Sequence, residues 1–328
     1  MSKKINKIGV MTSGGDSPGM NAAIRAVVRT CAYYNVECIG FYRGFQGMIS
    51  GDFVNLNARS VRNIINLGGT ILQSARSKDF LTEEGRAKAA ANLKEAEVDG
   101  MILIGGDGTF RGGQIFSQEH KISIIGVPGT IDNDIYGTNA TIGYDTALNT
   151  VVEAIDKIRD TASSHNRLFF VEVMGRDAGF IALNSGIGAG AEEILIPEED
   201  LGLDRLLDSL QRSRRSGKTS SIVVVSEGDK IGKNVFELAE YIKENLPDYE
   251  ARVSVLGHIQ RGGRPSCFDR VLASRLSVKA VELLLDGDSN VMVGIVNNEI
   301  EACNLDKALK GKHTINKELL RISDILST

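Results

Sequence analysis

The chain has 328 residues, of which 42% are hydrophobic and 24% are charged, and its formal net charge at pH 7 is −4. This composition is ordinary for a globular protein, so it argues against a disordered chain and against a nucleic acid as the main ligand. There is no apolar run of about 18 residues, and the first residues lead directly into a predicted strand, so we expect neither a membrane partner nor a secretory signal.

Predicted strands and helices alternate along almost the whole chain. Apolar residues at helical spacing predict helices at 20–34 and 145–161, and helix-like segments separate other strands. The alternation predicts an α/β fold with two similar Rossmann-like lobes, mainly parallel sheets and an active site in the cleft between the lobes. The predicted strands are short apolar runs at 7–12, 36–42, 100–104, 122–127, 168–174, 221–226, 252–256 and 291–296.

The cysteines give no sign of a metal site or a disulfide framework. Cys31, Cys38, Cys267 and Cys303 form no CxxC pair and no other metal-like spacing. We therefore expect reduced thiols in a cytoplasmic protein, with a redox role as the less favoured alternative.

Two loops rich in glycine and aspartate follow neighbouring predicted strands. Residues 105–109 read GGDGT and residues 128–134 read PGTIDND. Ligands of parallel sheets bind at the carboxyl ends of the strands, where glycines let the backbone approach phosphate oxygens. Aspartates at such a place suit Mg²⁺ coordination and proton abstraction from a hydroxyl. The two loops together predict phosphoryl transfer from a nucleotide to an alcohol.

The second of these loops is the more specific signal. GGDGT also occurs in NAD kinases and lipid kinases, and a glycine-rich turn without a ligand is its alternative interpretation. Aspartates after a buried strand have little structural reason to exist, because aspartate weakens strands and is costly to bury unpaired.

Two further motifs place anion-binding groups near the same edge. Residues 12–21, TSGGDSPGMN, lie between the first predicted strand and helix, where backbone N–H groups can face an anion, although a plain turn is the alternative. Arg76 offers a cation for a transferring phosphoryl group, although a surface salt bridge is the alternative.

Polar residues also end the strands in the second half of the chain. Residues 172–176, EVMGR, and Glu227 end strands where carboxylates can accept from sugar hydroxyls, although a surface role is equally compatible with the pattern. Arg252, His258 and Arg261 lie close together in the sequence and can bind a phosphate monoester through guanidinium donors. For His258 alone, a structural histidine is the alternative.

In order and spacing, these motifs resemble bacterial ATP-dependent 6-phosphofructokinase, from about residue 5 to about residue 310. The resemblance implies a homotetramer that transfers the γ-phosphoryl group of Mg-ATP to the 1-hydroxyl of fructose 6-phosphate in glycolysis. It implies Mg²⁺ as cofactor and allosteric effects of ADP or phosphoenolpyruvate. It also implies an ATP-binding lobe formed by 1–142 and 256–305, and a fructose 6-phosphate-binding lobe formed by 143–255 and 306–328.

The resemblance assigns roles to individual residues, with Asp132 as the general base and Asp107 as the Mg²⁺ ligand. Arg167 and Arg252 are implied to reach into a neighbouring subunit's site. The implied catalytic residues are Asp132, Thr130, Asp134, Arg176, Arg76 and Gly15. The implied ATP-binding residues are Gly15, Arg76, Gly106, Asp107, Gly108 and Thr109. The implied sugar-phosphate-binding residues are Thr130, Asp132, Asp134, Arg167, Met174, Gly175, Arg176, Glu227, Arg252, His258 and Arg261. The implied effector-binding residues are Arg25, Arg29, Arg159, Glu192 and Lys218.

The alternatives are a pyrophosphate-dependent enzyme and a non-catalytic regulatory subunit. Pyrophosphate-dependent relatives carry Asp where this chain has Gly108 and Lys where it has Gly129, so ATP is the favoured donor. A non-catalytic subunit would lack one or more catalytic residues, whereas the implied catalytic residues are all present.

The effector pocket departs from the family pattern at Ala58, where many members have Arg, at Ser216, where many have Lys, and at Asn63, where many have Asp. The loss of the two cations predicts weaker anion binding there.

Overall fold

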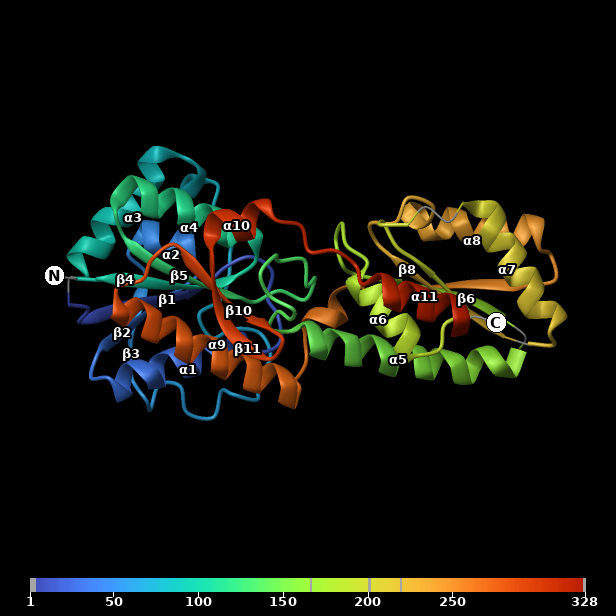
Figure 1. Cartoon of the computed structure of the whole chain (residues 1–328), viewed down its shortest axis with the longest axis horizontal. Helices are drawn as coiled ribbons and strands as arrows, with labels where there is room; N and C mark the ends of the chain where they lie inside the picture. The colour runs from blue at the N-terminus through green and yellow to red at the C-terminus, as the bar shows by residue number, and fades with distance from the viewer. Residues whose placement is uncertain (1–3, 166, 200–201, 219, 327–328) are drawn as a thin grey trace. The chain divides into compact units, whose positions relative to one another are not determined.

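The computed structural model describes residues 4–165, 167–199, 202–218 and 220–326. The chain forms two compact units (Figure 1). Unit 1 comprises Met1–Ile131, Ile135–Thr146 and Arg261–His313, and unit 2 comprises Asp132–Asp134, Ala147–Gln260 and Thr314–Thr328. The chain changes unit after Thr146, Gln260 and His313, whereas boundaries were expected after residues 142, 255 and 305, and the segment Asp132–Asp134 is grouped with unit 2 rather than with the residues around it.

Unit 1 contains a seven-stranded sheet in the order β11-β10-β5-β4-β1-β2-β3. The five central strands are parallel, whereas the edge strands β3 and β11 are antiparallel to their neighbours. The central strands are apolar because helices cover both faces of a parallel sheet. The strand bounds are β1 Lys7–Thr12, β2 Glu37–Phe41, β3 Phe53–Leu56, β4 Gly100–Gly105, β5 Ser123–Pro128, β10 Val291–Val296 and β11 Glu299–Asn304.

Helices cover both faces of this sheet, each over its own hydrophobic core (Figure 1). Helices α1 (Met20–Tyr33) and α9 (Cys267–Asp286) pack on one face, around residues such as Ile24 and Leu276. The other face carries α2 (Phe45–Ser50), α3 (Glu83–Glu95), α4 (Asp107–His120) and α10 (Leu305–Lys310). The short 3₁₀ helix η1 (Asp79–Leu81) precedes α3.

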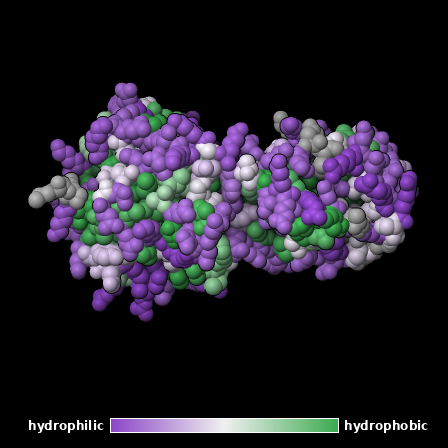
Figure 2. All heavy atoms as spheres, in the orientation of Figure 1, coloured by the Kyte–Doolittle hydropathy of each residue, from purple (hydrophilic) through white to green (hydrophobic). Residues whose placement is uncertain are grey.

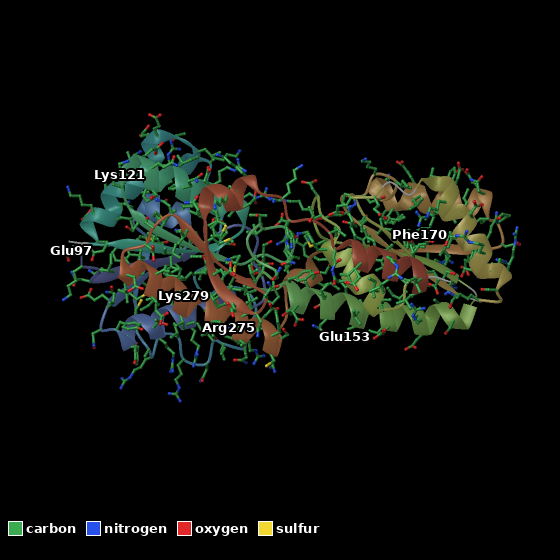
Figure 3. The ribbon with its side chains drawn as sticks, in the orientation of Figure 1. Glu97, Lys121, Glu153, Phe170, Arg275 and Lys279 are labelled. Atoms are coloured by element: carbon green, nitrogen blue, oxygen red, sulfur yellow. The ribbon has the colours of Figure 1, made fainter. Side chains whose placement is uncertain are left out.

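Unit 2 contains a four-stranded parallel sheet in the order β7-β8-β6-β9. Helices α7 (Leu203–Arg215) and α8 (Val235–Asn245) pack on one face, and Phe170 of β6 lies inside this core (Figure 3). Helices α5 (Tyr144–His165), α6 (Phe180–Gly188) and α11 (Lys317–Leu326) lie on the other face in Figure 1. The strand bounds are β6 Arg167–Val173, β7 Glu193–Leu195, β8 Ser221–Ser226 and β9 Glu250–Val255, and the 3₁₀ helices are η2 Gly232–Asn234 and η3 Gly257–Arg261.

The predicted α/β fold is confirmed, and all eight predicted strands are present with ends that differ by at most two residues. Strands β3, β7 and β11 were not predicted. Strand β7 has only three residues, and β3 and β11 are edge strands that are partly exposed, so none of them produces a continuous buried apolar run.

Hydrophilic residues cover most of the face visible in Figure 2. On the outer side of α9, Figure 3 shows Arg275 and Lys279, and Arg275 donates to both Asn298 Oδ1 and Asn298 O. Within the described part of the chain, no helix is both long and apolar enough to cross a bilayer. The four cysteines are unpaired thiols, and Cys31 and Cys38 are buried.

Candidate active site

Three loops leave adjacent parallel strands at one edge of the unit 1 sheet. Thr12 of β1 pairs with Ile104 of β4, and Gly105 of β4 pairs with Pro128 of β5. The loops that begin at residues 13, 106 and 129 therefore start side by side. This is the edge where parallel α/β sheets bind ligands.

The first loop leads into α1 and is crossed by an arginine from a distant part of the chain. Helix α1 begins after Gly19, which has a φ of 112° and provides no side-chain cap. Arg261 Nη1 lies 3.4 Å from the carbonyl oxygen of Asp16. A Cβ atom at residue 15 would collide with the Arg261 guanidinium, so Gly15 allows this close approach. The structure thus places Gly15 and Arg261 together within unit 1.

The second loop forms the amino terminus of α4. Asp107 is the first residue of this helix, and Gly106 before it provides no side-chain cap, so the helix terminus is available to an anion. Thr109 is 3% exposed, and its Oγ1 has no hydrogen-bond partner among the described residues. A Cβ atom at Gly108 would meet no heavy atom within 4 Å, so the space beside this glycine is open.

The third loop is closed by the segment that follows it. Gly129 forms a parallel bridge with Ile142, and Ile142 N–H donates to Pro128 O at 2.9 Å. Thr141 Oγ1 donates to Thr130 O at 2.6 Å. Asp132, two residues after Thr130, is 7% exposed. Asn133 has a φ of 54°, in the left-handed region that asparagine adopts more readily than most residues other than glycine.

The segment before Arg76 is held by two residues of the first strand and helix. Thr12 Oγ1 donates to Gln73 O at 2.8 Å. Asn21 is buried; its Nδ2 donates to Leu67 O and Gly68 O, and its Oδ1 accepts from Ile71 N–H. The 67–73 backbone is therefore fixed against the first loop's helix, while the Arg76 side chain is exposed.

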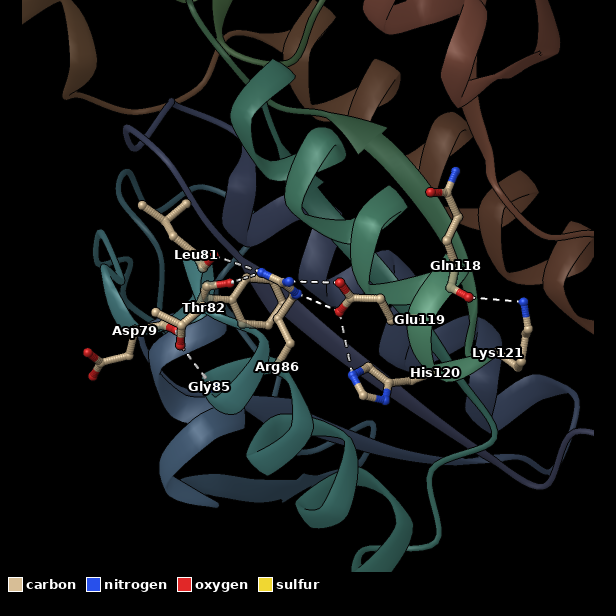
Figure 4. Close-up of polar contacts among 10 residues, drawn as sticks. Asp79, Leu81, Thr82, Gly85, Arg86, Gln118, Glu119, His120 and Lys121 are labelled. Atoms are coloured by element: carbon tan, nitrogen blue, oxygen red, sulfur yellow. Dashed lines mark hydrogen bonds and ion pairs between the residues drawn. The ribbon is translucent and has the colours of Figure 1, made fainter.

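The segment after Arg76 is held by Arg86 of α3 (Figure 4). Arg86 is 8% exposed, and its Nη1 donates to the carbonyl oxygens of Phe80 and Leu81. Its Nε and Nη2 donate to the two carboxylate oxygens of Glu119 at 2.5 and 2.7 Å, and these bonds lower the pKa of Glu119. Arg86 thus ties the loop after Arg76 to the end of α4. Sequence analysis missed this residue, because a single arginine within a helix belongs to no recognisable motif.

Unit 2 repeats the arrangement at the carboxyl ends of β6 and β8. Val173 pairs with Ser226, so Met174 and Glu227 follow the two strands side by side. Arg176 has a φ of 56°, and its backbone N–H donates to Glu227 Oε1 at 2.8 Å. Burial and the neighbouring Glu227 carboxylate raise the pKa of Glu172.

Gln260 connects the end of β6 to η3, which contains His258. Met174 N–H donates to Gln260 Oε1 at 3.2 Å, and Gln260 Nε2 donates to Gly257 O at 3.0 Å. Gln260 is fully buried, whereas His258 is exposed. The sequence pattern drew attention to His258 and Arg261 but not to Gln260 between them, because residue spacing does not reveal a buried hydrogen bond.

Arg167 and Arg252 lie toward the opposite edge of this sheet. Arg167 is the first residue of β6 and pairs with Glu250 of β9, and Arg252 is two residues further along β9. Both arginines form ion pairs with Glu250, with Arg167 Nε at 2.9 Å from Glu250 Oε2. A strand of this length spans about 20 Å. Within one chain, the structure does not bring them to the edge occupied by Met174 and Glu227.

The expected effector residues fall into two groups. On α1, Arg25 and Arg29 are one helical turn apart, and burial and the charge of Arg29 lower the pKa of Arg25. In unit 2, Glu192 is buried, with Arg159 Nη1 at 3.8 Å and Lys218 Nζ at 3.9 Å from its Oε1. Three of the five residues are therefore close together.

No cluster of three or more His, Cys, Asp or Glu side chains suited to a metal ion exists among the described residues. Magnesium sites that serve phosphoryl transfer take one or two carboxylates and complete the coordination with substrate phosphates. Asp107, at an uncapped helix terminus beside the glycine loop, fits such a site.

Comparison with known proteins agrees with this geometry. A family model described as phosphofructokinase matches residues 7–284. The chain is 57% identical over 323 residues to ATP-dependent 6-phosphofructokinase 1 of Thermus thermophilus, covering 98% of this chain and 100% of the relative. It is 53% identical over 323 residues to ATP-dependent 6-phosphofructokinase of Bacillus licheniformis, with the same coverage.

Solved structures give the same result. Phosphofructokinase from Saccharomyces cerevisiae superposes with a TM-score of 0.88 at 35% identity, covering 99% of this chain and 47% of the yeast chain, so this chain spans about half that relative's length. Pyrophosphate-dependent phosphofructokinase from Marinobacter aquaeolei superposes with a TM-score of 0.85 at 23% identity, which indicates the shared fold alone. The family match and the extent of identity show that this chain belongs to the phosphofructokinase family.

Proposed function

We propose that this chain is an ATP-dependent 6-phosphofructokinase. It transfers the γ-phosphoryl group of Mg-ATP to the 1-hydroxyl of fructose 6-phosphate, giving fructose 1,6-bisphosphate and ADP in glycolysis. The observation that carries the proposal is the origin of three loops side by side at one edge of the unit 1 sheet. The relatives named as ATP-dependent enzymes, at 50–57% identity, support ATP as the donor.

In this proposal, Asp132 is the general base that removes the proton of the 1-hydroxyl. Its position supports this role, because Asp132 lies 7% exposed in the loop that leaves β5, where a carboxylate can accept a proton from a bound hydroxyl. Thr130 and Asp134 flank it in the same loop and support the reacting centre. Arg76, Arg176 and the Gly15 backbone stabilise the charge on the transferring phosphoryl group, as cations and N–H groups do in other phosphotransferases.

The nucleotide phosphates bind at the uncapped amino terminus of α4, along residues 106–109. The buried Thr109 Oγ1, which has no partner among the described residues, supports a polar ligand at this place. Asp107 would hold Mg²⁺ together with the phosphates, and the ion would neutralise charge on the phosphoryl group.

Fructose 6-phosphate binds at the unit 2 residues, with Met174, Gly175 and Glu227 on the sugar. His258, Arg261, Arg167 and Arg252 bind its 6-phosphate. Because Arg167 and Arg252 lie toward the amino ends of their strands, we propose that they serve the site of a neighbouring subunit in a homotetramer.

ATP is preferred over pyrophosphate because of two glycines. The open space beside Gly108 admits the bulk of an α-phosphate, and an Asp there would bring a negative charge against it. At Gly129 even a Cβ atom would lie 3.2 Å from Ile104 Cγ2, so a Lys would need the neighbouring backbone or side chain to move.

Regulation and location are the remaining parts of the proposal. ADP or phosphoenolpyruvate would bind at Arg25, Arg29, Arg159, Glu192 and Lys218, although the absence of cations at Ala58 and Ser216 predicts weak binding. The enzyme would work in the cytoplasm, where four free thiols are compatible with a reducing environment.

A coupled assay of fructose 1,6-bisphosphate formation tests the proposed reaction. Purified protein is given fructose 6-phosphate and Mg²⁺ with either ATP or pyrophosphate. We expect turnover with ATP and little with pyrophosphate. The reverse preference would identify a pyrophosphate-dependent enzyme, and inactivity with both donors would identify a non-catalytic subunit.

A further inference from the structure

The carboxylate of Asp269 is fully buried at the start of α9 and binds a different part of the chain. Its Oδ1 accepts from the backbone N–H of Gly143 at 2.9 Å. Its Oδ2 accepts from the backbone N–H of Thr146 at 2.8 Å and from Thr146 Oγ1 at 2.5 Å. Asp269 itself has no exposed surface. Three donors from the segment that begins α5 therefore converge on one carboxylate.

Helices α5 and α9 cap each other through Asp145 and Thr146 of α5, Asp269 of α9 and the α9 N-cap Ser266. Ser266, the N-cap of α9, accepts from Asp269 N–H with its own Oγ. The backbone N–H of Ser266 donates to Thr146 Oγ1 at 2.9 Å, and Ser266 Oγ donates to Asp145 Oδ2 at 2.5 Å. An ordinary capping box would turn the carboxylate of Asp269 back to its own N-cap. Here the Asp269 carboxylate accepts from the first turn of α5 instead, and Thr146 Oγ1 of α5 accepts from the backbone N–H of Ser266.

The segment that Asp269 binds, 141–146, also closes the loop after β5, which contains Thr130 and Asp132. Thr141 and Ile142 bind the carbonyl oxygens of Thr130 and Pro128. Gly143, the next residue, donates to Asp269. Thr130 precedes Asp132 by two residues, so a continuous series of short contacts leads from α9 to the proposed base.

The same segment supports the first loop. A Cβ atom at Gly19 would lie 2.6 Å from Ile142 Cγ2 and 3.7 Å from Asp269 Cβ, and one at Gly143 would lie 2.6 Å from Ser17 Cβ. Gly19 and Gly143 thus lie closer to Ile142 and Ser17 than residues with a side chain could. A shift of residues 142–143 would therefore move the loop after β1 as well as the loop after β5. Burial raises the pKa of Asp269 to about 6, so both oxygens can still accept hydrogen bonds in an assay near pH 8.

We propose that Asp269 is a positioning residue for catalysis, which fixes the 141–146 segment and through it the Thr130–Asp132 backbone. The proposal rests on the proposed function, because it takes Asp132 as the base. Asp269 does not touch a substrate; it acts through Gly143, Thr146 and Thr141. Misplacement of a reacting group by about 1 Å can cost roughly 100-fold in rate, so a small movement of this loop is sufficient for a large effect.

The test compares variants that remove parts of the network. Asp269→Asn keeps the shape but leaves an amide NH₂ facing either Gly143 N–H or Thr146 N–H, so one donor loses its acceptor. Thr146→Val removes the hydroxyl that bridges Asp269 and Ser266. Thr146→Ser keeps that hydroxyl and is the conservative control.

A matched control removes a comparable carboxylate at the opposite edge of the sheet. Asp99 accepts from the backbone N–H groups of Asn6 and Lys7 at 2.8 and 3.2 Å, at the amino ends of β1 and β4. Asp99→Asn therefore perturbs a similar interaction far from the three loops. It is expected to alter thermal stability without altering kcat.

For each variant, kcat, the two KM values and the thermal midpoint are measured on folded protein, checked by circular dichroism. We expect kcat to fall roughly tenfold to 100-fold in Asp269→Asn and by less in Thr146→Val, with either KM changed less than about threefold. Thr146→Ser should keep most of the wild-type kcat. A purely structural role would lower the thermal midpoint and leave the kcat of the folded protein unchanged, and that result would overturn the proposal.

Two outcomes need separate interpretation. If Asp269→Asn does not fold, Thr146→Val decides, and a folded Thr146→Val with wild-type kcat refutes the proposal. If the wild-type protein has no phosphofructokinase activity, the proposed function fails first. An active wild type with active Asp269 and Thr146 variants contradicts only the positioning role.

Discussion

The two units place their candidate residues differently on their sheets. In unit 1, the residues expected to bind the nucleotide follow the carboxyl ends of β1 and β4, apart from Arg76, which comes just after the segment that Thr12 and Asn21 hold. In unit 2, Met174 and Glu227 follow the carboxyl ends of β6 and β8, whereas Arg167 and Arg252 lie toward the amino ends of β6 and β9. Arg167, at the start of β6, is roughly 20 Å from Met174 along the strand, too far for one small molecule to contact both.

This difference shows what each unit can do alone. In unit 1, the loops after β1, β4 and β5 come from one chain and lie together at the carboxyl ends of these strands. The unit 2 residues proposed to bind a sugar phosphate lie toward both ends of its strands, which is the arrangement expected if two subunits contribute to each sugar-phosphate site. The predictions below test whether catalysis depends on the first set within one chain and on the second set between chains.

The largest effect is expected from Asp132→Asn, which removes the proposed base while preserving its shape. Loss of a general base typically costs on the order of 10² to 10⁴ in rate. We expect kcat to fall by this amount with little change in either KM, measured by the coupled assay. A variant that keeps most of its turnover would show that Asp132 is not the base.

The next largest effect is expected from Gly108→Asp on the unit 1 loop. Like charges about 4 Å apart repel by roughly 1 to 4 kcal/mol between bulk water and a protein surface, which lowers kcat/KM for ATP between several-fold and several-hundred-fold. The thermal midpoint should change little, because nothing lies within 4 Å of the new Cβ. Unchanged ATP kinetics in a stable variant would place residue 108 outside the nucleotide site.

A smaller effect, on one substrate alone, is expected from Arg252→Ala in unit 2. Loss of a charged hydrogen bond costs about 1.5–3 kcal/mol, so the KM for fructose 6-phosphate should rise roughly tenfold to more than 100-fold. The KM for ATP should stay nearly the same, because only the sugar carries the 6-phosphate. Steady-state kinetics with each substrate varied in turn give the two KM values separately. Equal increases in the KM for fructose 6-phosphate and the KM for ATP would contradict the assignment of Arg252.

Mixed oligomers test the sharing of sites directly. Arg252→Ala and Asp132→Asn subunits are combined under conditions that let oligomers exchange, and mass spectrometry verifies mixing. If sites are shared between subunits, some sites of the mixed oligomers combine an intact Asp132 with an intact Arg252 of a neighbouring subunit. Activity at low fructose 6-phosphate should then return. Mixed oligomers without recovered activity would mean that each site is built from one chain.

The smallest effect is expected at the effector residues. Ala58 and Ser216 replace cations that many family members carry, so phosphoenolpyruvate should inhibit weakly. Rates are measured while phosphoenolpyruvate is titrated at subsaturating fructose 6-phosphate, with ADP as a second series. Strong sigmoidal inhibition below about 1 mM, within the usual range of metabolite KM values, would refute this expectation.

Sequence analysis predicted the fold and the family because their signals are local. Most of the central strands are continuous apolar runs, and the aspartates in the loop after β5 have little structural reason to follow a buried strand. The helix that became α5 was predicted too short, at 145–161 against Tyr144–His165, because Ala162 is the only apolar residue among its last four residues and is a weak signal. The edge strand β3 escaped prediction because it has only four residues and Asn55 interrupts its apolar run.

The positions of the candidate residues were less accessible to sequence reasoning. Arg252 and His258 are only six residues apart in the sequence, yet one lies toward the start of β9 and the other beyond its end. Arg261 follows them closely in the sequence, yet it lies in unit 1 against Gly15 and Asp16. Sequence distance is a poor guide here, because a strand carries the chain from one edge of a sheet to the other within a few residues.

By itself, the sequence determined the α/β class, the family and the chemical types of residue at the strand ends, since each depends on a short stretch of the chain. Only the tertiary structure decided which distant residues meet. Two examples are the ion pair of Arg86 with Glu119 and the hydrogen bonds of Asp269 with Gly143 and Thr146. The partners are far apart in the sequence, and no motif links them. Their contacts arise because packing brings helix ends together and buried charged groups must find donors or acceptors there, a requirement that no local pattern records.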